Sequence, residues 1–138
     1  MTYLLDTDSF TLAYYGKSGV SERVDRRRRT DPVGIPAITR FEVLRGRIAS
    51  VLTAADGEEL RGAFERLRLS EEFIAAFEIS PFTGVVCEIF DRLLPDKKDR
   101  RIGRADLLTA CIALAHDATL VTRNTKDFAI VPGLKIEN

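Results

Sequence analysis

Four acidic residues stand where a predicted strand ends or a predicted helix begins. Asp6 directly follows the apolar run 3–5, and Asp127 follows the apolar segment "TLVTR". Glu42 and Asp106 each lie in the first turn of a predicted helix. Burying an ionised carboxylate without a partner is costly. Acids in such places therefore need hydrogen bonds, a cation or water.

Taken singly, most of these acids have a structural explanation. Thr39 and Glu42 match the capping-box pattern, in which both side chains bond amide groups at the start of a helix. Asp8 is placed to cap the helix after the first strand, and Asp106 to complement a helix dipole. Asp127 is suited to a turn. Asp6 is the hardest to explain in this way, because no basic residue stands beside it.

Taken together, the acids indicate a bound cation. In an open parallel sheet, ligands bind at the carboxyl ends of the strands, and the starts of the following helices lie at the same edge. Two carboxylates about 5 Å apart repel by about 3 kcal/mol at an effective dielectric near 20. A divalent cation reverses this repulsion, and oxygen ligands without histidine or thiolate favour Mg²⁺ or Mn²⁺. Asp6 is therefore predicted to be a metal ligand.

The elements that position these acids alternate along the chain. Short apolar strands are separated by segments with apolar residues at helical spacing, which predicts an α/β fold with a parallel sheet and helices on both faces. Segment 56–77 is expected to form one long helix or two with a break near Ser70, and "NTKDF" a loop. The expected strands are 3–5, 33–38, 78–80, 119–123 and 134–136.

Length and composition predict one globular domain. The chain has 138 residues, of which 45% are hydrophobic, and its 21 basic and 21 acidic residues cancel. Any attraction to nucleic acid must therefore come from local patches. Cys87 and Cys111 stand in apolar helical segments, which predicts buried thiols in a reducing compartment. With no leader pattern and no run of about eighteen apolar residues, we expect a soluble cytoplasmic protein without membrane association.

Four stretches in sequence order resemble one family. "LLDTD" at the start, "TRFEVLRG", "IGRADLLTA" and "LVTRNTKDF" followed by "VPGL" are similar in order and spacing to PIN-domain ribonucleases. The similarity is greatest to the VapC-type toxins of bacterial toxin–antitoxin pairs. It spans nearly the whole chain, although each stretch alone is short.

The resemblance implies a fold, a site and an activity. The fold is a three-layer α/β/α PIN-like domain that takes in residues 1–138, and the activity is hydrolysis of RNA phosphodiester bonds with Mg²⁺ or Mn²⁺. By the family pattern Asp6, Glu42 and Asp106 are the core catalytic acids and metal ligands. Asp127 is the fourth acid, which binds the metal directly, through water, or only shapes its loop; Asn124 belongs to the same segment. Asp8 stands where the family often has asparagine, so its role is open between the site and a helix cap.

Basic residues near the acids are candidates for contacts with RNA phosphates. Arg40 and Arg104 are preferred because they lie nearest the acids in the sequence, and Thr7 and Asn124 are further candidates. For most other basic residues, solvated surface charge is the simpler interpretation. The remaining set comprises Arg45, Arg47, Lys97, Lys98, Arg100, Arg101 and the run Arg26 to Arg29, which is a solvated helix face or a contact for RNA or a partner.

The resemblance also implies partners, and two other functions compete with it. The expected partners are RNA, a cognate VapB-like antitoxin and a second copy of the chain in a homodimer. "LLDTDSF" also fits the opening of a haloacid-dehalogenase-type phosphohydrolase, in which two aspartates act as nucleophile and general acid. The rest of the chain fits such enzymes badly, because they need a later Ser or Thr at a strand end, a pocket lysine and a further acidic pair. A PIN-like module that binds RNA or protein without cutting is the third hypothesis.

Overall fold

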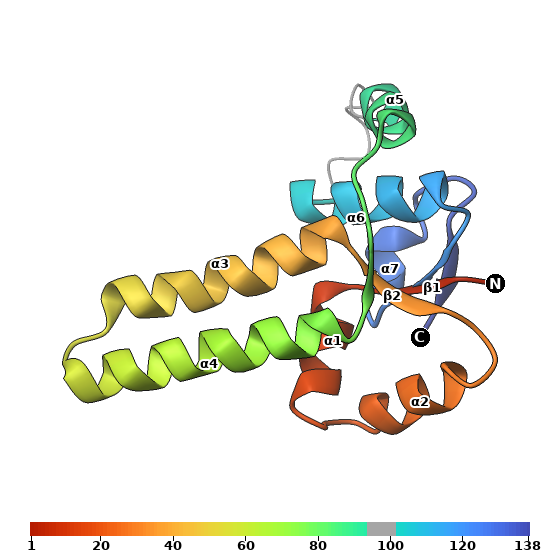
Figure 1. Ribbon diagram of the computed structural model, residues 1–138. Coiled ribbons are helices and arrows are strands. Elements are labelled where there is room, and N and C mark those ends of the chain that lie inside the picture. Colours follow the sequence, from red (N-terminus) through yellow and green to blue (C-terminus); the bar gives the residue numbers. More distant parts are fainter. Residues whose placement is uncertain (94–101) are drawn as a thin grey trace.

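The sheet has five short parallel strands with the first strand at its centre. The computed structural model describes residues 1–93 and 102–138. In this part of the chain the strand order is β3-β2-β1-β4-β5, and every neighbouring pair is parallel (Figure 1). The strands are β1 (Tyr3–Leu5), β2 (Val33–Pro36), β3 (Glu78–Ser80), β4 (Thr119–Val121) and β5 (Lys135–Glu137).

Each face of the sheet has its own hydrophobic core, because successive side chains of a strand point to opposite faces. Tyr3 and Leu5 belong to the core that includes Phe10 and Phe77, whereas Leu4 belongs to the core that includes Phe128. All six side chains are buried. The predicted α/β/α arrangement, with a parallel sheet between two helical layers, is confirmed.

The helices divide between these two faces. Helices α1 (Thr7–Tyr14), α2 (Val20–Arg27) and the end of α4 (Gly57–Ala75) supply buried residues to the core that includes Phe10. Helices α5 (Gly84–Leu93), α6 (Arg104–Ala115) and α7 (Thr125–Phe128) supply the other core. In neither described part is a helix long and apolar enough to cross a membrane.

Helix α3 (Ala37–Thr53) begins at the sheet and then leaves it. Its first turns contact both α1 and α6, and its remainder pairs with α4 in a helical hairpin that projects from the body of the molecule (Figure 1). Arg47 links the two helices, because its guanidinium donates to Ser70 Oγ at 2.9 Å and to Tyr15 Oη at 3.1 Å. The apolar side chains of Phe41, Ile48 and Leu52 on α3 are exposed.

Several expected elements differ in detail. The second strand ends at Pro36, which is the N-cap of α3, so α3 starts at Ala37. Segment 56–77 forms the single helix α4 without a break at Ser70, and "NTKDF" contains the short helix α7 and is not a loop. Cys111 is buried as expected, but the prediction of a buried Cys87 was wrong, because this thiol lies on the exposed side of α5.

The close approach of β2 and β3 yields a test of the fold. A Cβ built on Gly34 lies only 2.5 Å from the carbonyl oxygen of Glu78 on the neighbouring strand. We expect Gly34→Ala to lower the free energy of unfolding by about 1–3 kcal/mol, because two backbones must separate. Urea denaturation would measure the change.

Gly46→Ala is the matched control, because a Cβ at this helical position meets no atom within 4 Å. This substitution is expected to raise the free energy of unfolding by about 0.5–1 kcal/mol. Equal stability of the Gly34→Ala protein and the parent would contradict the tight strand contact.

Candidate active site

Asp6 is a buried carboxylate fixed at the carboxyl end of the central strand. Its backbone N–H donates to the Val121 carbonyl at 3.1 Å, which continues the pairing of β1 with β4. Its Oδ1 accepts a hydrogen bond from the Ser9 N–H at 2.8 Å, so Asp6 is the N-cap of α1. The side chain is only 7% exposed. Among described residues only Ser9 donates to this carboxylate, which leaves acceptor capacity for other groups.

Glu42 reaches the same edge of the sheet from α3 and is held there by a threonine. The Thr7 hydroxyl donates to Glu42 Oε1 at 2.5 Å, and it lies 3.5 Å from the hydroxyl of Thr39. Thr39 is buried and donates to the Leu5 carbonyl at 3.3 Å. This chain of contacts ties the first turns of α3 to the end of β1 and therefore fixes the distance between Glu42 and Asp6.

Asp106 and Asp127 are joined by an asparagine between β4 and α7. The Asn124 side-chain amide donates to Asp127 Oδ2 at 3.1 Å and to Asp106 Oδ2 at 3.4 Å. Asp106 stands in the first turn of α6, as predicted, and Asp127 lies in α7. Asp106 and Asp127 are 21 positions apart in the sequence. The single amide of Asn124 thus holds their two carboxylates close together.

Three carboxylates lie close enough to Asp106 to disfavour its charged form. The pKa of Asp106 is raised above its ordinary value, first by partial burial and then by the negative charges of Asp6, Glu42 and Asp127. The hydrogen bond from Asn124 partly opposes this effect. The structure thus brings together all four acids that the sequence singled out.

The donor set fits a hard divalent cation with a partly retained water shell. Carboxylate oxygens, one amide and one hydroxyl line the site, and such ligands suit Mg²⁺ or Mn²⁺. In residues 1–93 and 102–138, no three acidic, histidine or cysteine side chains are arranged to hold one ion directly. Mg²⁺ commonly binds one or two carboxylates and keeps several waters. The arrangement therefore suits a hydrated ion that Asp6 and Asp106 would hold with help from Glu42 or Asp127.

Two interpretations of single acids were wrong in their local detail. Asp8 was expected to cap the first helix, but Asp6 does so, and Asp8 is an exposed residue of the first turn. Thr39 and Glu42 do not form a capping box, because α3 starts at Ala37 and places Glu42 in its second turn. Sequence reasoning also overlooked the link from Thr39 to Leu5, for which the local sequence carries no signal beyond a buried threonine.

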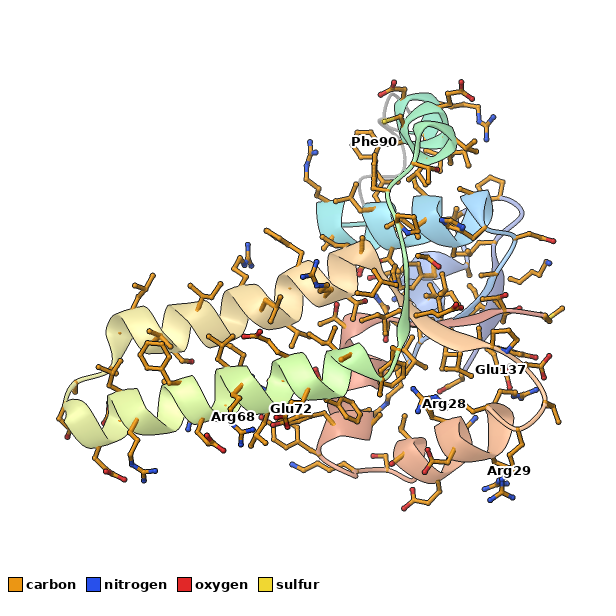
Figure 2. The ribbon with its side chains drawn as sticks, viewed as in Figure 1. Arg28, Arg29, Arg68, Glu72, Phe90 and Glu137 are labelled. Atoms are coloured by element: carbon orange, nitrogen blue, oxygen red, sulfur yellow. The ribbon has the colours of Figure 1, made fainter. Side chains whose placement is uncertain are left out.

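The basic residues expected near the acids are arranged differently. Arg40 is exposed, and the Arg104 guanidinium lies over the Phe90 ring of α5, 5.6 Å from its centre. Figure 2 labels Phe90 beside α5. Arg45 lies over the Phe41 ring, and Arg47 belongs to the α3–α4 hairpin. The contacts proposed for Arg40 and Arg104 stay predictions. Lys97, Lys98, Arg100 and Arg101 lie outside the described residues.

The fold and the acidic edge define a member of a known family. The family model for the PIN domain matches residues 3–134, so the chain belongs to the PIN domain family. The resemblance seen in the sequence is thereby confirmed.

Particular relatives share this fold and part of the sequence. Ribonuclease VapC2 from Rickettsia felis is 38% identical over 68 residues, which is 48% of this chain and about half (51%) of the length of that relative. The crystal structure of VapBC2 from R. felis bound to a promoter DNA fragment matches with a TM-score of 0.81 and 25% identity, covering 100% of this chain and 98% of the other. VapBC-1 from nontypeable Haemophilus influenzae matches with a TM-score of 0.80 and 24% identity over 100% and 98% of the two chains, a likeness of fold.

The raised pKa of Asp106 predicts how stability depends on pH without metal. The folded protein holds the Asp106 proton to a higher pH than the unfolded chain does, so this group costs stability as pH rises through its pKa. Asp106→Asn should therefore raise the melting temperature at neutral pH in EDTA. The gain should disappear well below the ordinary pKa of 3.8, where both states are protonated.

Thermal melting across this pH range, with the exposed α2 residue replaced in Asp25→Asn as control, would measure the effect. A gain that persists unchanged in acid would mean that the asparagine acts through packing and not through charge.

Proposed function

We propose that this protein is a metal-dependent endoribonuclease and the toxin of a VapBC-like toxin–antitoxin pair. The observation that carries the proposal is that four carboxylates converge on one edge of a PIN-type sheet. The negative charges of three of them raise the pKa of the fourth, Asp106. Membership of the PIN domain family and the match to a protein named Ribonuclease VapC2 support the same activity.

The acids would hold Mg²⁺ or Mn²⁺ against the scissile phosphate. A bound divalent ion supplies an activated water and neutralises charge that develops on the phosphate. Asp6 and Asp106 are the principal ligands in this proposal, and Glu42 and Asp127 are the flanking acids. The buried position of Asp6 and its amide hydrogen bond keep one carboxylate fixed in direction, so little reorganisation is needed when RNA binds.

Thr7 and Asn124 would act through the carboxylates that they contact. Thr7 orients Glu42, and Asn124 holds Asp106 and Asp127 at a fixed separation. Direct contacts of Thr7 and Asn124 with the substrate stay predictions from the sequence, because both side chains already donate to carboxylates. We regard them as positioning residues.

The proposal includes the organisation of the chain and its partners. Residues 1–138 would form one PIN-like nuclease domain that acts as a homodimer and is inhibited by a cognate VapB-like antitoxin. The R. felis and H. influenzae structures are VapBC complexes, which supports a partner of this class. The exposed apolar residues of the α3–α4 hairpin offer surface for such contacts.

The geometry gives no support to the phosphohydrolase alternative. That mechanism needs Asp6 and Asp8 to face one substrate, as nucleophile and general acid. Asp8 is exposed on α1, and its charge is not among those that raise the pKa of Asp106.

Cleavage of total RNA by the purified, partner-free protein would test the proposal. With Mg²⁺ or Mn²⁺ we expect discrete fragments, and EDTA should abolish them. Asp6→Asn, Glu42→Gln and Asp106→Asn should each lower the rate by about 10²–10³, because each removes charge stabilisation at the reacting phosphate. Asp8→Asn is the control, and its rate should match that of the parent.

Cleavage by the Asp6→Asn protein at the parental rate would place the activity in a contaminant or elsewhere in the molecule. Binding of RNA without cleavage under any metal condition would instead favour the non-cutting module, and formation of a phosphoaspartate with a small phosphate ester would favour the phosphohydrolase.

The Thr7 hydroxyl provides a test of positioning in the same assay. Thr7→Val keeps the shape of the side chain but removes the donor to Glu42, and we expect a loss of about 10–100-fold in activity. Thr7→Ser should restore most of the rate because it restores the hydroxyl. If Thr7→Val cuts RNA as fast as the parent, the contact with Glu42 has no catalytic consequence.

A further inference from the structure

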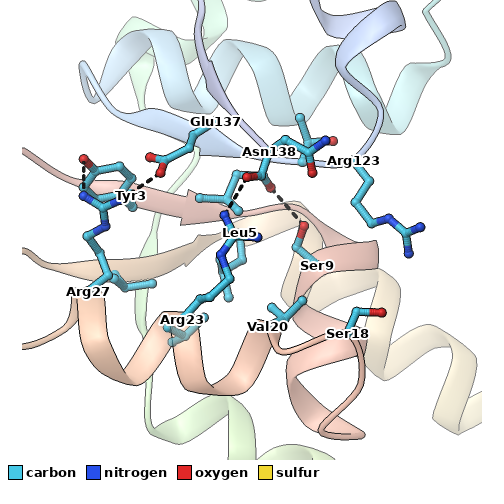
Figure 3. Close-up of a pocket in the computed structure, with 14 residues that line it drawn as sticks. Tyr3, Leu5, Ser9, Ser18, Val20, Arg23, Arg27, Arg123, Glu137 and Asn138 are labelled. Atoms are coloured by element: carbon cyan, nitrogen blue, oxygen red, sulfur yellow. Dashed lines mark hydrogen bonds and ion pairs between the residues drawn. The ribbon is translucent and has the colours of Figure 1, made fainter.

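A pocket beside the acidic site is lined by arginines that the proposed chemistry does not use. It lies on the α2 side of the sheet and has a volume of about 240 Å³ (Figure 3). Arg23 and Arg27 enter it from α2, and Arg123 enters it from the end of β4. Arg27 and Arg123 lie toward opposite ends of the pocket in Figure 3.

This pocket adjoins the acidic site through Ser9 and Arg123. Ser9 lines the pocket and donates its hydroxyl to the Val121 carbonyl at 3.2 Å, while its backbone N–H holds the Asp6 carboxylate. Arg123 directly precedes Asn124, whose amide holds Asp106 and Asp127. Ser9 and the neighbouring residues Arg123 and Asn124 therefore connect the pocket to the candidate catalytic acids.

The basic surface extends from the pocket along α2. A shallow groove is lined by Arg23, Arg26, Arg27 and Thr30 without any acidic residue, and it shares Arg23 and Arg27 with the pocket. Pocket and groove together are called the arginine groove below. Within the described part of the chain, no hydrogen bond or ion pair engages the guanidinium of Arg26 or of Arg123.

Other arginines of this region have structural partners. Arg27 pairs with Glu137 at 2.8 Å and donates to Tyr3 Oη at 3.1 Å, so its charge is largely committed. Arg28 lies over the Phe77 ring and donates to the Ala76 carbonyl. Arg23 donates to the backbone oxygen of Asn138 at 2.7 Å. The charges of Arg26 and Arg123 are therefore the ones that other groups of the described residues do not pair.

The pocket has an apolar wall behind this charged rim, and Ser9, Ser18 and Thr122 also line it. Leu5, Val20, Val24, Val33 and Val121 line it, and its volume is below the range of about 300–1,000 Å³ that drug-sized ligands occupy. Such a space suits one flat ring system better than a larger ligand. A charged rim over an apolar pocket matches a nucleotide, with phosphate at the arginines and base against the valines.

We infer that the arginine groove binds the RNA strand on one side of the scissile phosphate and that its pocket accepts one unstacked base. The inference rests on the proposed ribonuclease function and adds the path of the substrate. A chain with no net charge and an acidic site repels RNA at that site, so the attraction must come from a local basic track beside it.

Binding of a short fluorescein-labelled single-stranded RNA, followed by anisotropy in EDTA over a range of salt concentrations, tests the inference without cleavage. Each lost phosphate contact reduces the slope of log K against log salt by about 0.7. Arg26→Ala and Arg123→Ala should each show this loss, and the double variant about twice as much. Arg61→Ala, which removes an exposed arginine of α4, should keep the parental slope.

Val20→Trp tests the pocket itself by filling it. This variant should bind the same RNA about fivefold more weakly with an unchanged salt slope, because the base loses its site while the phosphate contacts remain. Thermal melting of each variant checks that the fold is intact. A weaker affinity in the arginine variants supports the groove even if Val20→Trp does not fold.

Parental affinity and slope in both arginine variants would overturn the inference and leave the ribonuclease intact, since the parent would still bind and cut RNA. The same result, combined with loss of binding to a VapB-like antitoxin, would assign the groove to that protein. If the parent binds no RNA in EDTA and cuts none with metal, the proposed function fails together with the inference.

Discussion

Mutual repulsion among carboxylates at one edge of the sheet is the constraint that the rest of the structure must satisfy. Four acids from distant segments are held close enough to raise the pKa of Asp106. Hydrogen bonds from Ser9, Thr7 and Asn124 hold them in place. Because β1 is the central strand, elements on both sides of it can deliver an acid to the same edge. A stable fold is thus used to maintain an electrostatically unfavourable arrangement, which a divalent cation would relieve.

The sequence was most informative where a residue type that could bind metal stands at a position that the sheet topology fixes. An acid after an apolar strand, as at Asp6, or in the first turn of a helix, as at Asp106, must lie at the carboxyl edge of a parallel sheet. Strand periods and helical spacing therefore predicted both the fold and the meeting of the four acids. The two faces of β1 also follow directly from the alternation of its three residues.

Sequence reasoning was weaker where backbone conformation or long-range contacts decide the outcome. Pro36 acts as a helix N-cap with extended backbone, so α3 starts two residues before Thr39, and the apparent capping box is lost. The partners of individual arginines depend on three-dimensional neighbours. Arg47 and Arg104 looked close to the acids in the sequence, yet they contact Ser70 and Phe90, whereas Arg23 and Arg123 drew no attention and line a pocket beside the site.

The hairpin of α3 and α4 has a mechanical consequence. A straight helix behaves as a stiff rod, and α3 extends about 1.5 Å per residue beyond the turn that carries Glu42. Its near end is bonded to the central strand through Thr7 and Thr39, while its far end packs against α4 (Figure 1). A force on the tip of the hairpin is therefore transmitted along α3 toward the turn that carries Glu42, and along α4 toward the core that contains Ile74.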